Sequence, residues 1–342
     1  MEQTLLKEGL LLNDDGSLTE SGYAFDLVKE YNRLAMGRNI NKRKEWDYYA
    51  FLNDANGVCI TVSNLSYLAL FSLTYIDFKI NKYITKTYIK LNPRDKKFIL
   101  PKDSSTGNIS IHERNYSFSI KHVNDERVIT VIMKNFANHD AVKVSLKVKE
   151  TTEKSMVIAT PFEKKHQFYY NQKKNLLLGA GSIEIGRRGI NIKPCLGVLD
   201  WGRGIWSRDN TWYWSSLNYV DETGNNVGFN LGYGFGDTSK ATENMFFFNK
   251  EAFKLNDVKF EFTQDEKGNI DFLKEIKVNS ESKDIDLIFT PLFNRHDETN
   301  AIIIKTNQNQ VFGRFNGTIT AEGKTYEIKN ALGFLEKVHN VY

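Results

Sequence analysis

Alternation of apolar and polar residues is the dominant pattern along this chain. In the segment VKVSLKVK, residues 142–149, valine and leucine alternate with lysine and serine. Successive side chains of a strand point to opposite faces of a sheet, so this segment predicts a strand with one buried and one solvated face. Turn signals such as Asn124–Asp125 and Lys267–Gly268 separate further segments of this kind. The other predicted strands cover residues 59–80 (two strands around 63–66), 115–122, 127–136, 154–161, 258–264 and 284–291. Many short strands, with almost no helical pattern after residue 40, predict antiparallel β-barrels or sandwiches.

The N-terminal part carries the clearest helical pattern. Aromatic and apolar residues recur at helical spacing from Tyr23 through Leu27 and Tyr31 to Leu34. The serine at 17 or the threonine at 19 is suited to cap the start, and Gly37 is suited to end the helix. We therefore expect one short helix before the strands.

The segment VGFNLGYGFGD, residues 227–237, has two faces of opposite character. One face carries only large apolar or aromatic residues, and the other carries four glycines and Asn230. Glycine destabilises a strand interior, so this bare face requires a partner. Either another backbone or a large aromatic side chain packs on it, or it forms the floor of a cavity.

Length and composition indicate an ordered protein with room for two domains. The 342 residues are 13% aromatic, mostly Phe and Tyr, which favour strands and bury large areas. The charged and polar segment 162–175 marks the boundary between the halves. We expect residues 1–165 to form the helix and a first barrel, and residues 166–342 to form a second barrel.

Charge and cysteine content narrow the partners. The net charge is only +4, and the lysines alternate with apolar residues instead of clustering, so nucleic-acid binding is not expected. No secretory signal and no apolar run of about 20 residues is present, so we expect no transmembrane segment, although transient membrane contact is compatible with the sequence. Two distant cysteines, Cys59 and Cys195, favour a reducing cytoplasm, and no Cys/His spacing indicates a metal site.

Residues 199–216, LDWGRGIWSRDNTWYWSS, hold four of the five tryptophans, with Asp200 and Arg203 among them. A carboxyl desolvated by aromatic rings has a raised pKa and can act as a general acid. Indole faces can then stabilise the cation that forms when an alkene is protonated. The alternative is that Asp200 pairs with Arg203. Buried charges are normally paired, so pairing is the favoured hypothesis, although an arginine here is also suited to bind a ligand carboxylate or Glu243.

We interpret this stretch as a turn-linked strand pair in the second barrel, facing the glycine-rich strand. In that arrangement Trp212 and Trp214 fill the space that the glycines leave, which is as good an explanation as a ligand pocket. Downstream, Glu243 and Asn244 lie where a loop at a barrel mouth would meet a ligand, whereas Asp237 suits a turn. The candidate catalytic residues are Asp200 and Glu243, and the candidate ligand-binding residues are Trp201, Arg203, Trp206, Trp212, Trp214, Asn230, Tyr233 and Asn244.

Several segments resemble a known family. They are KRKEWDYY (42–49), LDWGRGIW with TWYW behind it, GFNLGYGFGDTSKATEN (228–244), FTPLFNR (289–295) and FGRFNG (312–317). In this order, and over nearly the full length, they resemble the bacterial family called domain of unknown function 2804. That family is similar to the double-lipocalin superfamily, which includes AttH-like proteins, carotenoid hydratases and tocopherol cyclase. The resemblance implies an all-β fold of two lipocalin-like antiparallel β-barrels packed together, a hydrophobic small-molecule ligand, and no metal or organic cofactor. It implies no particular reaction.

Three functions fit these observations. The first is cofactor-independent hydration, cyclisation or isomerisation of a lipid or isoprenoid-like molecule by a carboxyl general acid. The second is a lipid carrier that uses the same cavity without catalysis. The third is carbohydrate binding or hydrolysis, with Asp200 and Glu243 as the two carboxyls. The oligomeric state is not predicted.

Overall fold

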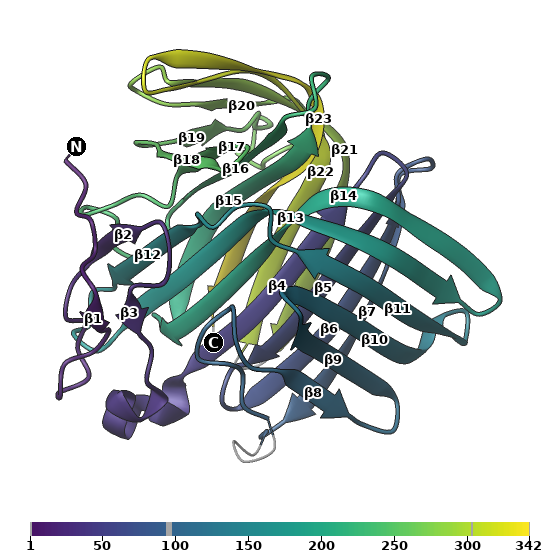
Figure 1. Ribbon diagram of the computed structural model, residues 1–342, viewed down its shortest axis with the longest axis horizontal. Helices are drawn as coiled ribbons and strands as arrows, with labels where there is room; N and C mark the ends of the chain where they lie inside the picture. The colour runs from purple at the N-terminus through teal and green to yellow at the C-terminus, as the bar shows by residue number, and fades with distance from the viewer. Residues whose placement is uncertain (1, 94–97, 302–303, 342) are drawn as a thin grey trace.

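The computed structural model describes residues 2–93, 98–301 and 304–341, which form two curled antiparallel sheets (Figure 1). In spatial order, the first sheet contains β7 (Lys82–Leu91), β6 (Leu68–Asp77), β5 (Asn56–Asn64), β4 (Lys44–Leu52), β14 (Arg188–Ile205), β13 (Phe168–Ile185), β11 (Asp140–Lys149), β10 (Glu126–Ala137), β9 (Tyr116–Val123) and β8 (Ile109–His112). Two short strands, β12 (Met156–Pro161) and β2 (Gly22–Ala24), extend it beside β13.

The second sheet contains only later residues. In spatial order it runs through β18 (Glu251–Lys254), β17 (Met245–Phe248), β16 (Asn226–Tyr233), β15 (Asp209–Val220), β23 (Lys324–Val341), β22 (Ile304–Ala321), β21 (Ile285–Ala301), β20 (Ile276–Asn279) and β19 (Lys259–Glu261). A separate parallel pair joins β1 (Gly9–Leu10) to β3 (Lys29–Glu30).

The predicted strands are present, and the turns between them have the expected geometry. Residues 59–80 form most of β5 and β6, with a turn at Ser66. Between β9 and β10, Asn124 and Asp125 both have positive φ angles, 47° and 61°, which a two-residue hairpin turn requires. The alternation seen in the sequence therefore predicted the strands because most of them have one buried and one exposed face.

The helix lies later in the chain than expected. Tyr23 belongs to β2, where it pairs with Ile158 of β12, so pairing with a distant strand overrides the local helical spacing. The helix that forms is the 3-10 element η1 (Arg33–Lys42), whose start is capped by the side chain of Asn32. Gly37 lies inside η1 and breaks it, with φ 53° and ψ −127°, instead of ending it.

The tryptophan-rich stretch joins the two sheets, so its expected place as a strand pair within the second barrel is wrong. β14 pairs with β13 and β4 of the first sheet and ends at Ile205, whereas β15 begins at Asp209 in the second sheet. The chain thus crosses between sheets at residues 206–208, downstream of the expected boundary near residue 165. The division into domains 1–165 and 166–342 stays a prediction.

A third apolar core lies between the two sheets, in addition to one core inside each sheet. We call this layer of side chains the seam. It is built from β4, β5, β6 and β14 of the first sheet and from β15, β21, β22 and β23 of the second. Figure 1 shows how the strands of the second sheet lie beside the central strands of the first. Burial of one sheet against the other is what gives β14 two buried faces.

The close approach of β11 to β13 explains the glycine at position 181 of β13. A Cβ atom placed on Gly181 would lie 1.9 Å from the carbonyl oxygen of Ser145 in the neighbouring strand β11, whereas a Cβ on Gly189 of β14 would meet nothing within 4 Å. We expect Gly181→Ala to lower the free energy of unfolding by about 3 kcal/mol through overpacking. The matched Gly189→Ala change should alter it by less than about 1 kcal/mol, as urea unfolding would measure. Equal effects would show that β11 and β13 are farther apart.

Candidate functional site

Four strands place every second side chain in the seam. In the first sheet, Ala50 and Tyr48 of β4 pair with Val198 and Asp200 of β14. In the second sheet, on the opposite side of the seam, Trp214 of β15 pairs with Glu336 of β23. Same-face residues are about 7 Å apart along a strand, so these side chains form successive levels. We name four levels in their order along the strands. The first two are the groove level (Leu52, Leu196, Asn218 and Leu332) and the Phe334 level (Ala50, Val198, Ser216 and Phe334). The next two are the carboxyl level (Tyr48, Asp200, Trp214 and Glu336) and the aromatic level (Trp46, Gly202, Trp212 and Val338).

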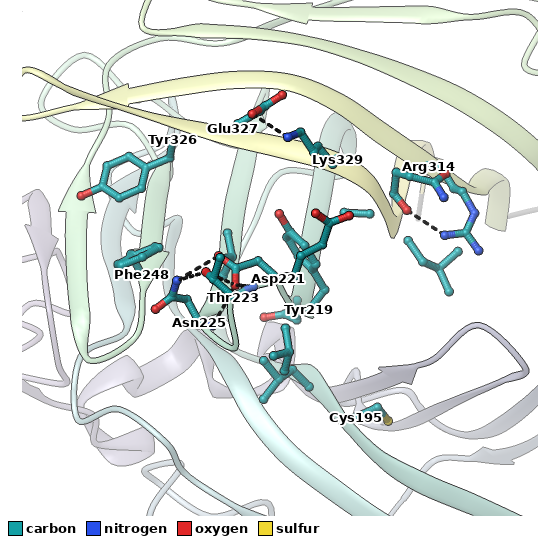
Figure 2. A pocket seen from close by; sticks show the side chains of 18 of the residues that line it. Cys195, Tyr219, Asp221, Thr223, Asn225, Phe248, Arg314, Tyr326, Glu327 and Lys329 are labelled. Carbon is teal, nitrogen blue, oxygen red and sulfur yellow. Dashed lines mark hydrogen bonds and ion pairs between the residues drawn. The ribbon is translucent and has the colours of Figure 1, made fainter.

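The seam opens at the groove level into a cavity of about 650 Å³. Its walls combine apolar surface, such as Phe248 and Tyr326, with charged pairs that bridge or line the rim (Figure 2). Arg314 of the second sheet binds Asp54 of the first at 2.8 Å. A second space of about 10 Å³ lies deeper in the seam, where residues of the groove level and the Phe334 level line it. The groove therefore points along the seam toward the carboxyl level.

Asp200 is buried in the seam and is paired, but not with the expected partner. Its carboxylate lies 3.1 Å from the ammonium of Lys173 and accepts a 2.6 Å hydrogen bond from the Asn171 amide. Asp200 and Arg203 are three residues apart on a strand, so they point to opposite faces of the sheet. The predicted Asp200–Arg203 pair is therefore wrong, although the expectation that the carboxylate is paired is right.

Arg203 and Trp201 belong to the interior of the first sheet. The Arg203 guanidinium lies 2.9 Å from Asp47 and donates to the carbonyl oxygens of Trp46 and Pro101. It also stacks 4.2 Å from the Trp201 ring, which is fully buried. Burial raises the pKa of Asp47 more than Arg203 lowers it. These contacts hold the guanidinium inside the first sheet, on the face of β14 that points away from the seam.

A chain of polar contacts crosses the seam from Lys173. Its ammonium lies 3.7 Å from the Trp214 ring centre, and the Trp214 indole donates a 2.6 Å hydrogen bond to Asn230. The Asn230 amide in turn donates to the backbone oxygen of Glu243 at 2.6 Å. Desolvation raises the pKa of the buried Glu243 carboxyl, although Lys173 opposes the shift. The structure thus brings together four sequence-predicted residues: Asp200, Trp214, Asn230 and Glu243.

Glu243 and a leucine, rather than the tryptophans, account for the bare face of β16. A Cβ on Gly232 would lie 2.7 Å from the Glu243 carboxylate, and a Cβ on Gly228 would lie 2.9 Å from Leu176 of the first sheet. Trp214 lies beside Gly232 in the same sheet, as its register partner. The hypothesis that the indoles pack onto the glycines is therefore wrong, because the glycines make room for Glu243 and for the other sheet.

Glu336 is the functional candidate that the sequence did not reveal. One carboxylate oxygen accepts a 2.9 Å hydrogen bond from the Trp212 indole, and the other accepts a 3.1 Å hydrogen bond from Gln310. Gln310 also donates to the Tyr48 hydroxyl at 3.0 Å, which links the two sheets. Desolvation raises the pKa of Glu336 to about 7. The residue as a whole is half-buried, and its carboxylate oxygens lie in the seam, where Trp212 and Gln310 bind them.

Aromatic rings close the seam beyond the carboxyl level. Trp46 lies 4.6 Å from Trp206 and 6.1 Å from Trp212, measured between ring centroids, and Phe235 contacts both Trp206 and Trp212. Trp46 and Trp212 are half-buried, whereas Trp206 is 4% exposed. The buried indole nitrogens of Trp46 and Trp206 have no hydrogen-bond partner in the described structure. Of the expected tryptophans in this cluster, Trp212 therefore contacts Glu336, whereas Trp206 packs against other aromatic rings.

Tyr233 and Asn244 have other surroundings. Tyr233 stacks on Tyr213 at 4.5 Å, on the face of the second sheet that points away from the seam. The Asn244 side chain accepts a 2.7 Å hydrogen bond from the Gly232 backbone and donates to the Asn256 carbonyl oxygen, which holds the loop before β17. Their contacts are those of packing and loop closure.

Neither a metal cluster nor a membrane helix is evident in the part of the chain that the structure describes. Among residues 2–93, 98–301 and 304–341, no three His, Cys, Asp or Glu side chains are grouped to hold a metal ion. No helix in these ranges is long and apolar enough to cross a bilayer.

The sequence matches a family model over almost its whole length. The chain belongs to the family described as domain of unknown function DUF2804, whose model covers residues 2–342. A search of curated proteins found no match to this chain.

Two solved structures are similar to the whole chain. An AttH-like protein from Nitrosomonas europaea has a TM-score of 0.52 at 12% identity, covering 86% of this chain and 92% of that one. Kievitone hydratase from Nectria haematococca has a TM-score of 0.47 at 10% identity, covering 97% and 98%. The first likeness and the two curled antiparallel sheets confirm the predicted all-β, lipocalin-like fold with one short helix.

The Asp200–Lys173 pair provides a test of the buried charges. Removal of one partner leaves the other charge buried, so we expect Lys173→Met to lower the free energy of unfolding by about 3 kcal/mol. The double variant Lys173→Met/Asp200→Asn should be more stable than the sum of the single changes predicts, by about 2 kcal/mol. Urea unfolding of the four proteins measures this coupling. Additive effects would contradict a direct ion pair.

Proposed function

We propose that this member of the domain of unknown function 2804 family binds a hydrophobic small molecule between its two sheets and transforms it without a cofactor. The observation that carries the proposal is Glu336, a half-buried carboxyl with a pKa raised to about 7 by desolvation. A group that is protonated for part of the time at neutral pH is suited to general acid–base catalysis. Glu336 is bound by the half-buried Trp212, and we propose that it exchanges protons with solvent on that side.

The carboxyl level assigns different roles to its two acids. Asp200 accepts a hydrogen bond from Asn171 and lies beside the Lys173 ammonium. It therefore serves to hold Lys173, whereas Glu336 is the general acid. Glu243, buried and with a raised pKa, is a second proton carrier on the other side of Trp214. Glu336 therefore replaces Asp200 as the proposed general acid, and Glu243 remains a candidate catalytic residue.

Lys173 also selects among the reactions. Its ammonium already lies against the Trp214 ring, so that indole face is not free to stabilise a substrate cation. The ammonium, although paired with Asp200, is a donor that can stabilise negative charge developing on a substrate. Hydration or isomerisation of a polarised double bond therefore fits the site better than cation-driven cyclisation.

A non-catalytic carrier is the second candidate. The specific observation that favours it is that the cavity of about 650 Å³ lies at the groove level, about 13 Å along the strands from Glu336. A ligand that stays in the groove would be bound without meeting the carboxyl. The free, buried thiols of Cys59 and Cys195 fit a reducing cytoplasm, which we retain as the proposed location for either function.

The first experiment identifies the ligand and tests Glu336 together. Native mass spectrometry and solvent extraction of protein purified from its own host should yield a bound apolar molecule. Incubation of that molecule with fresh protein should change it, and Glu336→Gln should slow the change by about 100-fold because the proton donor is lost. Glu184→Gln, which removes an exposed carboxyl of β13, is the control and should have no effect. Turnover at an unchanged rate in Glu336→Gln would overturn the role of Glu336 as the general acid. A bound molecule that the natural protein does not change would leave the carrier function.

The raised pKa of Glu336 also predicts how stability depends on pH. The folded protein holds this proton up to about pH 7, whereas the unfolded chain loses it near the ordinary value of 4.5. Stability from this group is therefore present below about pH 4.5 and is lost as the pH rises through 7. Glu336→Gln stays neutral, so its unfolding temperature should exceed that of the natural protein increasingly between pH 5 and 8, by an amount equivalent to roughly 1–3 kcal/mol. A difference that is constant with pH would show an ordinary pKa.

A further inference from the structure

We propose that Phe334 is the gate between the groove and the carboxyl level, and that it selects which ligands reach Glu336. The selection of ligands rests on the proposed function, whereas the position and movement of the Phe334 ring in the seam do not. Phe334 lies on β23 between Leu332, which lines the groove, and Glu336, and all three point into the seam.

Phe334 is the one large side chain of its level. The other members, Ala50, Val198 and Ser216, are small, so the phenyl ring fills the space that they leave. The ring is 1% exposed and packs edge-on against Trp214, with a centroid distance of 4.9 Å, and against Tyr48 at 6.5 Å. On its groove side lies the residual space of about 10 Å³. The ring thus separates an open cavity from the aromatic wall of the carboxyl level.

Displacement of one ring would join the two compartments. Backbone hydrogen bonds hold Ser216 of β15 in register with Phe334, so the strands themselves leave little freedom. A side-chain rotation needs no change in this pairing, and the small residues opposite would then border an open passage. The passage would admit a narrow or flat apolar group, with the rest of the ligand remaining in the wider groove. This geometry predicts elongated ligands whose reactive end is slender.

The two cysteines are natural reporters for the two compartments. Cys195 lines the groove, whereas Cys59 is the register partner of Ala50 and belongs to the cluster that contains Tyr48, Trp214 and Phe334. Cys59 is 2% exposed and is free. A small neutral disulfide such as 4,4′-dithiodipyridine would therefore reach Cys59 from the groove only when the ring moves. Exchange forms a mixed disulfide on the cysteine and releases one thiopyridone.

The experiment compares labelling rates of the whole protein by peptide mass spectrometry. We expect Phe334→Ala to accelerate labelling of Cys59 at least about tenfold, because local opening no longer requires movement of the ring. Labelling of Cys195 should change less than about twofold, since this residue belongs to the core of the first sheet and not to the cluster that contains Phe334. Phe334→Leu should give an intermediate rate and provides the test if the alanine variant folds poorly.

Phe118→Ala is the matched control. Phe118 is also fully buried, and it lies in the core of the first sheet, which carries Cys59, but it packs against Phe71 and Tyr116 instead of the seam. At equal stability, set with urea, only the Phe334 variants should label Cys59 rapidly. Equal acceleration in Phe118→Ala would show general loosening and would overturn the gate, as would unchanged labelling in both Phe334 variants. These outcomes do not depend on a ligand, so they are separate from a failure of the proposed function.

Discussion

Burial of the first sheet's central strands on both faces is the constraint on which the rest of the structure depends. β14 contributes Trp201 and Arg203 to the interior of the first sheet, and Asp200 and Gly202 to the seam. Adjacent residues of one short motif therefore face different environments. Because both environments exclude water, each must satisfy its own charges, and a pair across the strand cannot form. Arg203 is matched by Asp47, and Asp200 by Lys173, on opposite faces.

Buried ion pairs such as these contribute little to stability, so stability alone does not explain their presence. The cost of removing both charges from water offsets most of their attraction, so apolar side chains would serve packing as well or better. The seam is otherwise aromatic and aliphatic, with Phe293, Phe312 and Phe334 in one cluster. The charged groups Lys173, Asp200 and Glu336 nevertheless gather at one level, where Lys173 connects to Trp214 and Asn230. This arrangement supports the proposed general-acid function.

The sequence predicted the strands and the fold class because alternation reports directly which faces are buried. It could not predict the sheet to which a strand belongs, since β14 and β15 have similar patterns and differ only in their hydrogen-bonded partners. Composition marked Asp200 because tryptophans surround it in the chain. Glu336 had no such mark: the indole that binds it belongs to Trp212, 124 residues earlier. Long-range pairing of strands creates that contact, and no local pattern records it.

The position of the carboxyl level between two unlike ends supports the proposed catalysis. On one side lies the groove, which is large enough for an organic ligand, and Phe334 stands before it. On the other side lie Trp46 and Trp212, which are both half-buried, and Trp212 binds Glu336. A carrier needs only the groove, and a buried acid would add cost without benefit. The proposed general acid would meet the ligand from one side and exchange protons from the other, so that proposal requires both ends of the seam.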